Sequence, residues 1–487
     1  MTEGTTFISS GVPGLDEVLG GGLRPGFLYF LEGDSGTGKT TLALQFLLEG
    51  ARRGERTLVV SFSETAGELA TAAVSHGWTL DGIHVRDLTD GMDKGGAPVL
   101  FHLSETTLDE RVSELLDAVD EVRPERMVVD TLSALRILSD HPGHLRRQME
   151  MIQHRVRQRD CTLLMVDRVF GEDLLHPRSL AWGIVRLEQS FRQYGPERRR
   201  MYVPKLRGQR YLGGYHDMRI NTGGVEIFPS LRIAASRSAV ESQLTSTGLG
   251  SLDALLGGGL RAGTSTALLG PPGSGKSTLV SQLAVSLANR NLHGTIFLFD
   301  ESVETFRVRA RCQDLNIDAC LDNGTLRVHR VDPAECSPGQ FADRLRRLVE
   351  KNDLGFLAID SLNGYLHAMP DEQFMHLHVH DLLNYLAAKG VITLLTMTQP
   401  GPFDSGRRIA MDLSYLADTA ILQRFFESEG AIHWAISVMK KRYGHHEHTI
   451  REYRIGSGGL ELGEPLTRFR GVLTGVPEYT GEQSPPI

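Results

Sequence analysis

A glycine-rich pattern that occurs twice constrains this chain more than any other feature. The segments "GDSGTGKTT" (residues 33–41) and "GPPGSGKST" (residues 270–278) both contain the sequence G-x-x-x-x-G-K-[ST]. In each copy a short apolar run precedes the glycines, and a segment with helical spacing of its apolar residues follows them. Glycines in such a loop let successive backbone N–H groups face a phosphate, and the lysine adds a positive charge. The pattern therefore predicts two phosphate-binding loops.

All residues of both loops are candidates for nucleotide binding. In the first copy we expect Lys39 to reach the β- and γ-phosphates and the Thr40 hydroxyl to bind Mg²⁺. Lys276 and Ser277 take these places in the second copy. The loops consist of Gly33, Asp34, Ser35, Gly36, Thr37, Gly38, Lys39, Thr40 and Thr41, and of Gly270, Pro271, Pro272, Gly273, Ser274, Gly275, Lys276, Ser277 and Thr278.

The two loops lie in a long internal repeat. "SSGVPGLDEVLGGGLRPG" at residues 9–26 returns as "STGLGSLDALLGGGLRAG" at residues 246–263, an offset of 237 residues. A period this long, which contains a complete phosphate-binding loop, indicates two tandem domains rather than a stack of short repeats. The small and polar segment "AASRSAVESQL" has no clear apolar period, so we interpret it as a linker. The predicted divisions are a first domain at 1–233, the linker at 234–244, a second domain at 245–467 and a flexible tail at 468–487.

Short apolar runs alternate with helical patterns inside each repeat. "RTLVVSF", "RMVVDT" and "CTLLMVD" are continuously apolar, which is typical of parallel strands buried on both faces. The segment 105–122 instead has apolar residues at helical spacing, namely Leu108, Val112, Leu115, Leu116 and Val119. Strands that alternate with helices predict an α/β fold, with a mainly parallel sheet flanked by helices in each domain.

Two aspartates stand at the ends of predicted strands. "RMVVD" ends at Asp130 and "GFLAID" ends at Asp360. A carboxylate at the end of a strand next to a phosphate-binding loop can hold Mg²⁺ and its water shell. An aspartate in this position can also simply cap the next helix, and the residues alone leave both interpretations open. The predicted metal-binding residues are Thr40, Asp130, Ser277 and Asp360.

Further carboxylates follow another predicted strand of each repeat. "SFSET" supplies Glu64, with Ser63 before it, and "FDES" supplies the adjacent Asp300 and Glu301. Hydrolysis of a nucleotide requires a carboxylate that orients the attacking water or takes its proton. Glu64, Asp300 and Glu301 are therefore the catalytic candidates. The alternative is that they are solvated acids at the start of the next helix.

Each repeat also carries a basic triplet on a late predicted strand. The triplets are Lys205, Leu206 and Arg207 in the first repeat and Lys440, Lys441 and Arg442 in the second, and all six residues are candidates for nucleotide binding. Alternate residues of a strand project from the same side, so the outer members of each triplet point together. These cations can reach a γ-phosphate held by a neighbouring subunit, or they can form a solvated strand face.

Composition narrows the class of protein. The net charge of -8 and the pI near 6.1 argue against a surface built mainly to hold nucleic acid. The four cysteines form no Cys-x-x-Cys pair, so neither a zinc site nor a disulfide framework is indicated. No stretch approaches the roughly 18 apolar residues that span a membrane, and no secretory signal is visible. We expect a cytoplasmic protein without a membrane partner.

Taken in order, these motifs resemble those of the KaiC family of RecA-like ATPases. The run from "SSGVPGLDEVLGGG" to "GDSGTGKTT", the strand-end acids and "KLRG" carry the resemblance, which covers nearly all of residues 9–467. It implies two tandem RecA-like P-loop NTPase domains, ATP and Mg²⁺ bound between subunits, and a double-ring homohexamer. It also implies that the outer residues of both basic triplets act across the subunit interface. A role in signalling or timing follows from the resemblance, with a KaiB-like protein as a candidate partner.

Two departures from the family pattern bear on activity. KaiC-type domains carry adjacent glutamates where this chain has Ser63–Glu64 and Asp300–Glu301, which puts hydrolysis by the first domain in question. The family's second domain phosphorylates itself on a neighbouring serine and threonine, and the matching pair here is Ser414 and Tyr415. The resemblance thus implies an ATPase and a candidate serine autokinase, with Ser414 as the modified residue.

The two repeats also differ at the end of a later predicted strand. RecA-like proteins keep a polar γ-phosphate sensor there, and "TMTQ" supplies Gln399 in the second repeat. The first repeat has "MVDRV" at this place, with Asp167 and Arg168. The sensor is therefore not duplicated.

Two other classes of function remain open from the sequence. A DNA-stimulated RecA-like motor would share the loops, although the acidic balance and the lack of a helix-hairpin-helix or zinc module argue against it. An ATP-bound scaffold without significant catalysis would also share them. Ser63 favours the scaffold for the first domain.

Overall fold

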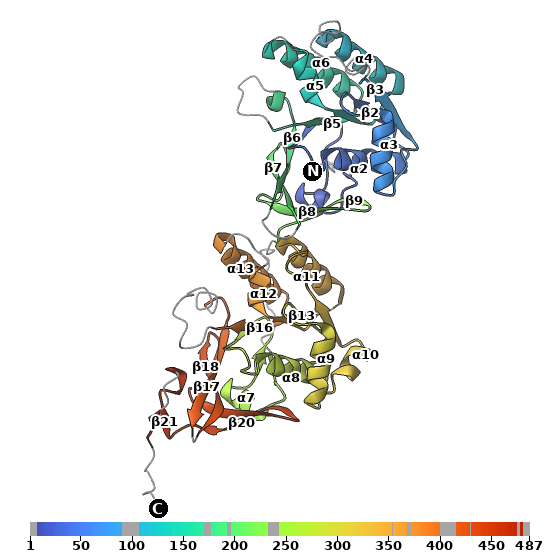
Figure 1. The fold of residues 1–487 in the computed structure, drawn as a ribbon. Helices are drawn as coiled ribbons and strands as arrows, with labels where there is room; N and C mark the ends of the chain where they lie inside the picture. The colour runs from blue at the N-terminus through green and yellow to red at the C-terminus, as the bar shows by residue number, and fades with distance from the viewer. Residues whose placement is uncertain are drawn as a thin grey trace, which may run out of the picture. The chain divides into compact units, whose positions relative to one another are not determined.

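The computed structural model describes residues 7–89, 107–139, 141–169, 177–191, 196–231, 243–352, 354–367, 372–399, 415–428, 430–474 and 478–480. The chain separates into two compact units, Met1–Ser230 and Leu231–Ile487 (Figure 1). Each unit has its own sheet and its own hydrophobic core.

A mainly parallel sheet is the framework of the first unit. Its strands are β1 (Leu28–Gly33), β2 (Thr57–Ser61), β3 (Ile83–Asp87), β4 (Arg126–Asp130), β5 (Thr162–Asp167), β6 (Gly183–Ser190), β7 (Arg198–Leu206), β8 (His216–Asn221) and β9 (Gly224–Phe228). In the described residues they form one nine-stranded sheet in the order β3-β2-β4-β5-β1-β6-β7-β8-β9. Neighbours from β3 to β6 in this order are parallel, and β7, β8 and β9 extend the sheet as antiparallel strands.

Helices cover both faces of this sheet (Figure 1). They are α1 (Leu15–Val18), α2 (Lys39–Arg52), α3 (Ala66–Ser75), α4 (Leu108–Val122), α5 (Leu132–Ile137) and α6 (Pro142–Gln158), followed by the short 3-10 helix η2 (Pro177–Ser179). Leu58 and Val60 of β2 pack into the core under α4 and α6, whereas Val59 packs into the core under α2. The strands read as continuous apolar runs because both of their faces are buried.

Helix α4 shows how local sequence sets an element. The Thr107 hydroxyl accepts a hydrogen bond from the Glu110 N–H, and the Glu110 carboxylate accepts one from the Thr107 N–H. This reciprocal capping box satisfies N–H groups that the helix itself leaves without acceptors. Leu108 and Leu115 of the predicted stripe are 1% and 0% exposed, so the apolar face meets the core as the spacing predicts.

The second unit repeats this architecture. Its strands are β10 (Leu244–Thr245), β11 (Leu260–Arg261), β12 (Ser265–Gly270), β13 (Gly294–Leu298), β14 (Leu326–Arg330), β15 (Phe356–Asp360), β16 (Ile392–Thr398), β17 (Thr419–Ser428), β18 (Ala431–Lys441), β19 (Arg451–Gly456) and β20 (Gly459–Pro465). The main sheet has the order β14-β13-β15-β16-β12-β17-β18-β19-β20, which matches the first sheet position for position. Its helices are α7 (Gly250–Leu255), α8 (Lys276–Ala288), α9 (Val303–Cys312), α10 (Ile317–Asp322), α11 (Pro338–Asn352), α12 (Leu362–His367) and α13 (Glu372–Ala388).

Residues beyond 467, which the sequence assigns to a flexible tail, include further structure. They contain β21 (Phe469–Arg470), the 3-10 helix η3 (Val472–Thr474) and β22 (Glu478–Tyr479), and β21 pairs antiparallel with β22. Val472 is 1% exposed and packs with Phe426 and Ala435 of the second unit. The described part of this segment therefore packs on the second unit.

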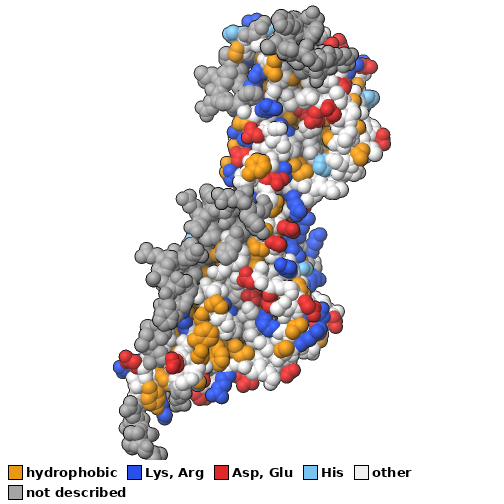
Figure 2. Space-filling model, in the orientation of Figure 1, with side chains coloured by type: hydrophobic (Ala, Val, Ile, Leu, Met, Phe, Trp, Pro, Cys, Tyr) orange, Lys and Arg blue, Asp and Glu red, His pale blue; other side chains and the backbone are white. Residues whose placement is uncertain are grey.

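The predicted fold class is confirmed: two mainly parallel sheets, each flanked by helices, follow one another along the chain. On the visible face in Figure 2, acidic and basic side chains are interspersed over each unit. Among the helices that the structure describes, none is both long and apolar enough to cross a membrane.

Candidate functional site

The first glycine-rich loop connects β1 to α2 at the carboxyl edge of the parallel strands. Gly36 and Gly38 have φ angles of 81° and 94°, in the left-handed region that glycine adopts without steric cost. A Cβ atom on Gly38 would also lie 2.6 Å from Cδ1 of Ile220. The loop leads directly into the N-terminus of α2, whose free N–H groups favour a bound phosphate.

The strand-end aspartate lies beside this loop. Asp130 ends β4 and is 3% exposed, and its Oδ2 accepts a 2.9 Å hydrogen bond from Oγ1 of Thr40. Lys39 Nζ donates to the carbonyl of Asp34 at 2.7 Å. Burial lowers the pKa of Lys39, and the charge of Asp130 opposes that shift. The structure thus brings Lys39, Thr40 and Asp130 into one cluster.

Glu64 joins this cluster from the end of β2. The Phe62 N–H donates to the carbonyl of Asp130 at 2.7 Å, which keeps the end of β2 against the end of β4. Burial raises the pKa of the Glu64 carboxyl, and the neighbouring charge of Asp130 raises it further. Its Oε2 is buried and has no hydrogen-bond partner among the described residues, whereas Ser63 is exposed. A carboxylate in such surroundings is suited to orient water or to accept its proton.

The second loop has the same geometry between β12 and α8. Gly273 and Gly275 both have a φ angle of 80°. Lys276 is 8% exposed, and its Nζ donates to the carbonyls of Gly270 at 2.9 Å and Pro271 at 2.8 Å. Burial lowers the pKa of Lys276 to about 8, although the charge of Asp360 opposes the shift. The lysine is therefore enclosed by main-chain acceptors of its own loop.

Asp360 ends β15 beside this second loop. Its Oδ1 accepts a 2.5 Å hydrogen bond from Oγ1 of Thr396. Its Oδ2 is buried and has no hydrogen-bond partner in the described part of the chain. Buried polar atoms usually have a partner, and carboxylate and hydroxyl oxygens are the ligands that Mg²⁺ prefers. The residues therefore fit a divalent cation, which Ser277 and Asp360 would hold here and Thr40 and Asp130 would hold in the first unit.

The adjacent acids of the second unit have different partners. Oδ2 of Asp300 accepts a 2.5 Å hydrogen bond from Oγ of Ser361, the residue that follows Asp360. Glu301 instead forms an ion pair with Arg309 of α9, with 2.5 Å between Oε1 and Nη2. The first repeat has Ala72 at the position of Arg309. Asp300 therefore lies with the strand-end aspartate, and Glu301 is held toward α9.

The basic triplets do not lie at the loops of their own units. Lys205 of β7 pairs with Ile184 near the start of β6, whereas Gly33 pairs with Leu187. This register separates the two sites by about 10 Å along the strands. In the second unit Lys440 pairs with Ala420, which is aligned with Ala267, three residues before Gly270. Each triplet thus lies toward the amino ends of the parallel strands, whereas the loop of the same unit lies at their carboxyl ends.

The outer lysines of both triplets bind main-chain carbonyls. Lys205 Nζ donates to the Arg178 carbonyl at 2.8 Å, and Lys440 Nζ donates to the carbonyls of Tyr415 at 2.9 Å and Ala417 at 2.8 Å. Arg442 Nη2 also donates to the Tyr415 carbonyl at 2.9 Å. Arg207 Nη2 donates to the Ser179 carbonyl at 3.3 Å. Ser414, the predicted modified residue, lies outside the described residues and precedes Tyr415 in the sequence.

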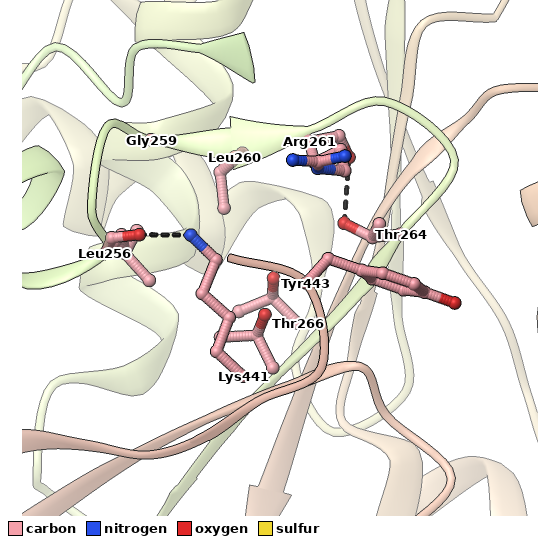
Figure 3. A pocket seen from close by; sticks show the side chains of 9 residues that line it. Leu256, Gly259, Leu260, Arg261, Thr264, Thr266, Lys441 and Tyr443 are labelled. Carbon is pink, nitrogen blue, oxygen red and sulfur yellow. Dashed lines mark hydrogen bonds between the residues drawn. The ribbon is translucent and has the colours of Figure 1, made fainter. Parts of the chain in front are cut away.

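The middle residues of the triplets turn into their own units. Leu206 packs against the hydrophobic core of the first unit. Lys441 extends beside a small pocket at β11, where its Nζ donates to the Leu256 carbonyl (Figure 3). The same pocket is lined by Arg261, whose carbonyl accepts from the Thr264 hydroxyl at 2.8 Å. The alternation of side chains along a strand explains why the outer and middle residues face different ways.

Sequence reasoning missed an ionic cluster beside the first loop. Glu32 precedes Gly33 and is 0% exposed, and it pairs with Arg178 at 2.5 Å and with Arg186 at 2.8 Å. The second repeat has Leu269 in place of Glu32. A buried acid in one repeat where the other has leucine is the sequence signal for this cluster. The cluster also connects β1 to Arg178, whose carbonyl accepts a hydrogen bond from Lys205.

Comparison with known proteins identifies the family. A family model described as the KaiC ATPase matches residues 8–232 and again residues 245–467. The chain belongs to the KaiC family. The circadian clock oscillator protein KaiC of Thermosynechococcus vestitus is 25% identical over 477 residues, which cover 96% of this chain and 90% of that protein. The circadian clock protein KaiC3 of Synechocystis sp. is 24% identical over 491 residues, which cover 99% and 96%.

As a KaiC-family member the chain is a nucleotide-binding ATPase with two tandem RecA-like domains. Both matched segments contain a complete loop and a strand-end aspartate. The identity to these clock-related KaiC proteins is only 24–25%, so the sites of this chain can differ from theirs.

We expect the affinity of the second KaiC loop for ATP to fall as the pH rises above about 8. Lys276 has a pKa of about 8 without nucleotide, and a neutral lysine no longer attracts phosphate. Binding must then take up a proton, so the affinity should fall by up to about tenfold per pH unit. Titration with a fluorescent ATP analogue between pH 7 and 9.5 measures this in a Lys39→Ala background, in which the first loop lacks its cation.

The matched control is Lys276→Arg in the same background, because arginine stays charged over this range. Its affinity should change little with pH. A flat profile for the parent with Lys276 intact would show that this lysine keeps its proton.

Proposed function

We propose that this protein hydrolyses ATP with Mg²⁺ as a double-ring homohexamer in which each nucleotide lies between two subunits. The observation that carries the proposal is the separation of the basic triplets from the loops of their own units. The γ-phosphate in each loop then receives Lys205 and Arg207, or Lys440 and Arg442, from the adjacent subunit. A cation supplied from a neighbour stabilises the charge that develops in phosphoryl transfer.

Each loop residue has a role in this proposal. Lys39 and Lys276 neutralise the β- and γ-phosphates, and backbone N–H groups of the glycines hold the phosphate oxygens. Mg²⁺, when bound, lowers the charge on the phosphates. Thr40 and Asp130 hold it in the first domain, and Ser277 and Asp360 in the second.

We assign the water-orienting role to Glu64 in the first domain and to Asp300 in the second. Glu64 has a buried oxygen beside Asp130 that has no hydrogen-bond partner among the described residues. Asp300 is linked through Ser361 to the end of β15. Glu301 is the weaker candidate because Arg309 already neutralises it.

A second activity, autophosphorylation of Ser414, is favoured by a specific observation. The carbonyl of the adjacent Tyr415 accepts hydrogen bonds from Lys440 and Arg442, the residues that we expect to reach a neighbour's γ-phosphate. In that assembly the Ser414 hydroxyl attacks the γ-phosphorus, the bond to the β-phosphate oxygen breaks, and ADP leaves. Asp300 or Glu301 of the subunit that holds the ATP takes the hydroxyl proton.

The biological setting follows from the relatives. We propose that the protein acts in the cytoplasm in signalling or timing and that a KaiB-like protein is its candidate partner. The relatives named above are circadian clock proteins, which supports this setting.

Mixing two impaired variants tests the shared site. Lys276→Ala lacks the loop cation, and the double variant Lys440→Ala/Arg442→Ala lacks the cations lent to a neighbour. Neither should hydrolyse ATP in its second domain, but in rings mixed at equal amounts about a quarter of the interfaces should be intact. Phosphate release is measured with Glu64→Gln in every chain, so that the second domain supplies the signal.

The control for this experiment is each variant alone at the same total concentration. Activity of the mixture that equals the mean of the two separate samples would contradict a site shared between subunits. A protein that stays monomeric with saturating ATP and Mg²⁺ would contradict the hexamer.

Replacement of single carboxylates tests the catalytic assignment. Glu64→Gln and Asp300→Asn should each remove the hydrolysis of one domain, and the double variant should lose about 10²–10⁴-fold in rate. Glu301→Gln should stay within about twofold of the parent, since Arg309 already holds that side chain. Unchanged hydrolysis in Glu64→Gln would favour an ATP-bound scaffold role for the first domain.

Peptide mapping tests the kinase activity. After incubation with ATP and Mg²⁺, we expect a phosphate on Ser414 and none in a Ser414→Ala variant, with Tyr415 unmodified in both. Intact mass and fragment spectra measure the modification. An unmodified Ser414 under every nucleotide condition would leave the protein an ATPase alone.

A further inference from the structure

The side chain of Arg424, a residue outside every sequence motif, extends across the start of the second loop. Arg424 belongs to β17 and Gln399 follows β16, the two strands that flank β12 on either side. Nη2 of Arg424 donates to Oε1 of Gln399 at 3.1 Å, and the Gln399 N–H donates to the Gly270 carbonyl at 3.1 Å. A bond between the outer two strands must pass across the end of the middle one. The guanidinium therefore lies at the point where the loop begins.

Arg424 has spare hydrogen-bonding capacity. Its side chain is half-buried, and its Nε is buried without an acceptor among the described residues. Within the described part of the chain, no carboxylate forms an ion pair with it. Burial lowers its pKa. A cation that is partly desolvated and lacks an anion is poised to bind one.

The first domain carries the opposite charge at this position. Leu269 and Glu32 are equivalent positions of the two repeats, and they pair with Leu422 and Arg186. Two residues further along these strands, Arg424 is therefore equivalent to Glu188. Glu188 forms an ion pair with Arg200 of β7 at 2.9 Å, so it is directed toward its neighbouring strand. The positive charge of Arg424 is therefore specific to the second site, because the equivalent position in the first domain has a negative charge.

We propose that Arg424 binds the γ-phosphate of ATP held in the second loop, as a ligand from the same chain. Gln399 orients its guanidinium through the hydrogen bond at 3.1 Å. This inference rests on the proposed function, and it adds a phosphate ligand beyond the loop lysine and the residues lent by a neighbour. Because the contact is to the terminal phosphate, Arg424 makes the second domain prefer ATP over ADP.

The position of Gln399 points to the γ-phosphate rather than to the α-phosphate. The Gln399 N–H and Lys276 Nζ both donate to the Gly270 carbonyl, and the lysine of such a loop reaches the β- and γ-phosphates. An arginine held by this glutamine therefore lies at the terminal end of the phosphate chain. A bifurcated guanidinium suits a phosphate with several free oxygens.

The test compares nucleotide affinities of an Arg424→Gln variant. All chains carry Lys39→Ala, so that the first loop lacks its cation, and titrations use ADP and a non-hydrolysable ATP analogue with Mg²⁺. The affinity for the ATP analogue should fall about 10–100-fold, the loss typical of one charge-assisted hydrogen bond. The affinity for ADP should stay within about twofold. Arg424→Lys should recover part of the loss because it keeps the charge.

The matched control is Arg454→Gln, since Arg454 is an arginine of the same unit with a side chain that is 79% exposed. Both affinities should be unchanged in this control. An equal loss for ADP and the ATP analogue in Arg424→Gln, or no loss for either, would overturn the inference. A parent that binds neither nucleotide through its second loop would instead contradict the proposed function.

Discussion

The carboxyl edge of the parallel strands is the constraint on which both sites depend. Parallel strands end together, so β1, β2 and β4 bring their following residues to one place, and β12, β13 and β15 do the same. Gly33, Glu64 and Asp130 are far apart in the sequence, yet each follows or ends one of these strands. The buried faces of the sheet hold this edge in position. Ligands bind at such edges in open α/β sheets for the same reason.

Much of this arrangement could be predicted from the sequence. The repeat and the cluster of Lys39, Thr40 and Asp130 follow from motifs whose chemistry is local to a strand end. The partners of Glu301 and Arg424 could not be predicted. Arg309 and Gln399 reach them from other elements, and only tertiary packing decides those contacts. The spacing of apolar residues does not predict which polar side chains contact each other.

The two domains share a fold and differ in where charge is stored. In the first, Glu32 is buried with Arg178 and Arg186 beside the loop, whereas the second has the apolar Leu269 there. In the second, Arg424 lies at the loop and forms no ion pair with a carboxylate of the described residues. Arg309 neutralises Glu301. A buried ion pair contributes little to stability compared with an apolar pair but fixes geometry. The duplicated fold therefore supports two sites with different electrostatic surroundings.

The placement of each loop and its basic triplet toward opposite edges of one sheet gives the chain a direction. In the proposed assembly, a copy that accepts cations at the loop end of its strands offers its own at the opposite end, so the contact surface would not be self-complementary. Head-to-tail contacts of this kind either close into a ring or continue as a filament. In the proposed assembly, ring closure is what completes the last site. An opened ring would lose only the site at the break, whereas dissociation into single subunits would remove every shared site.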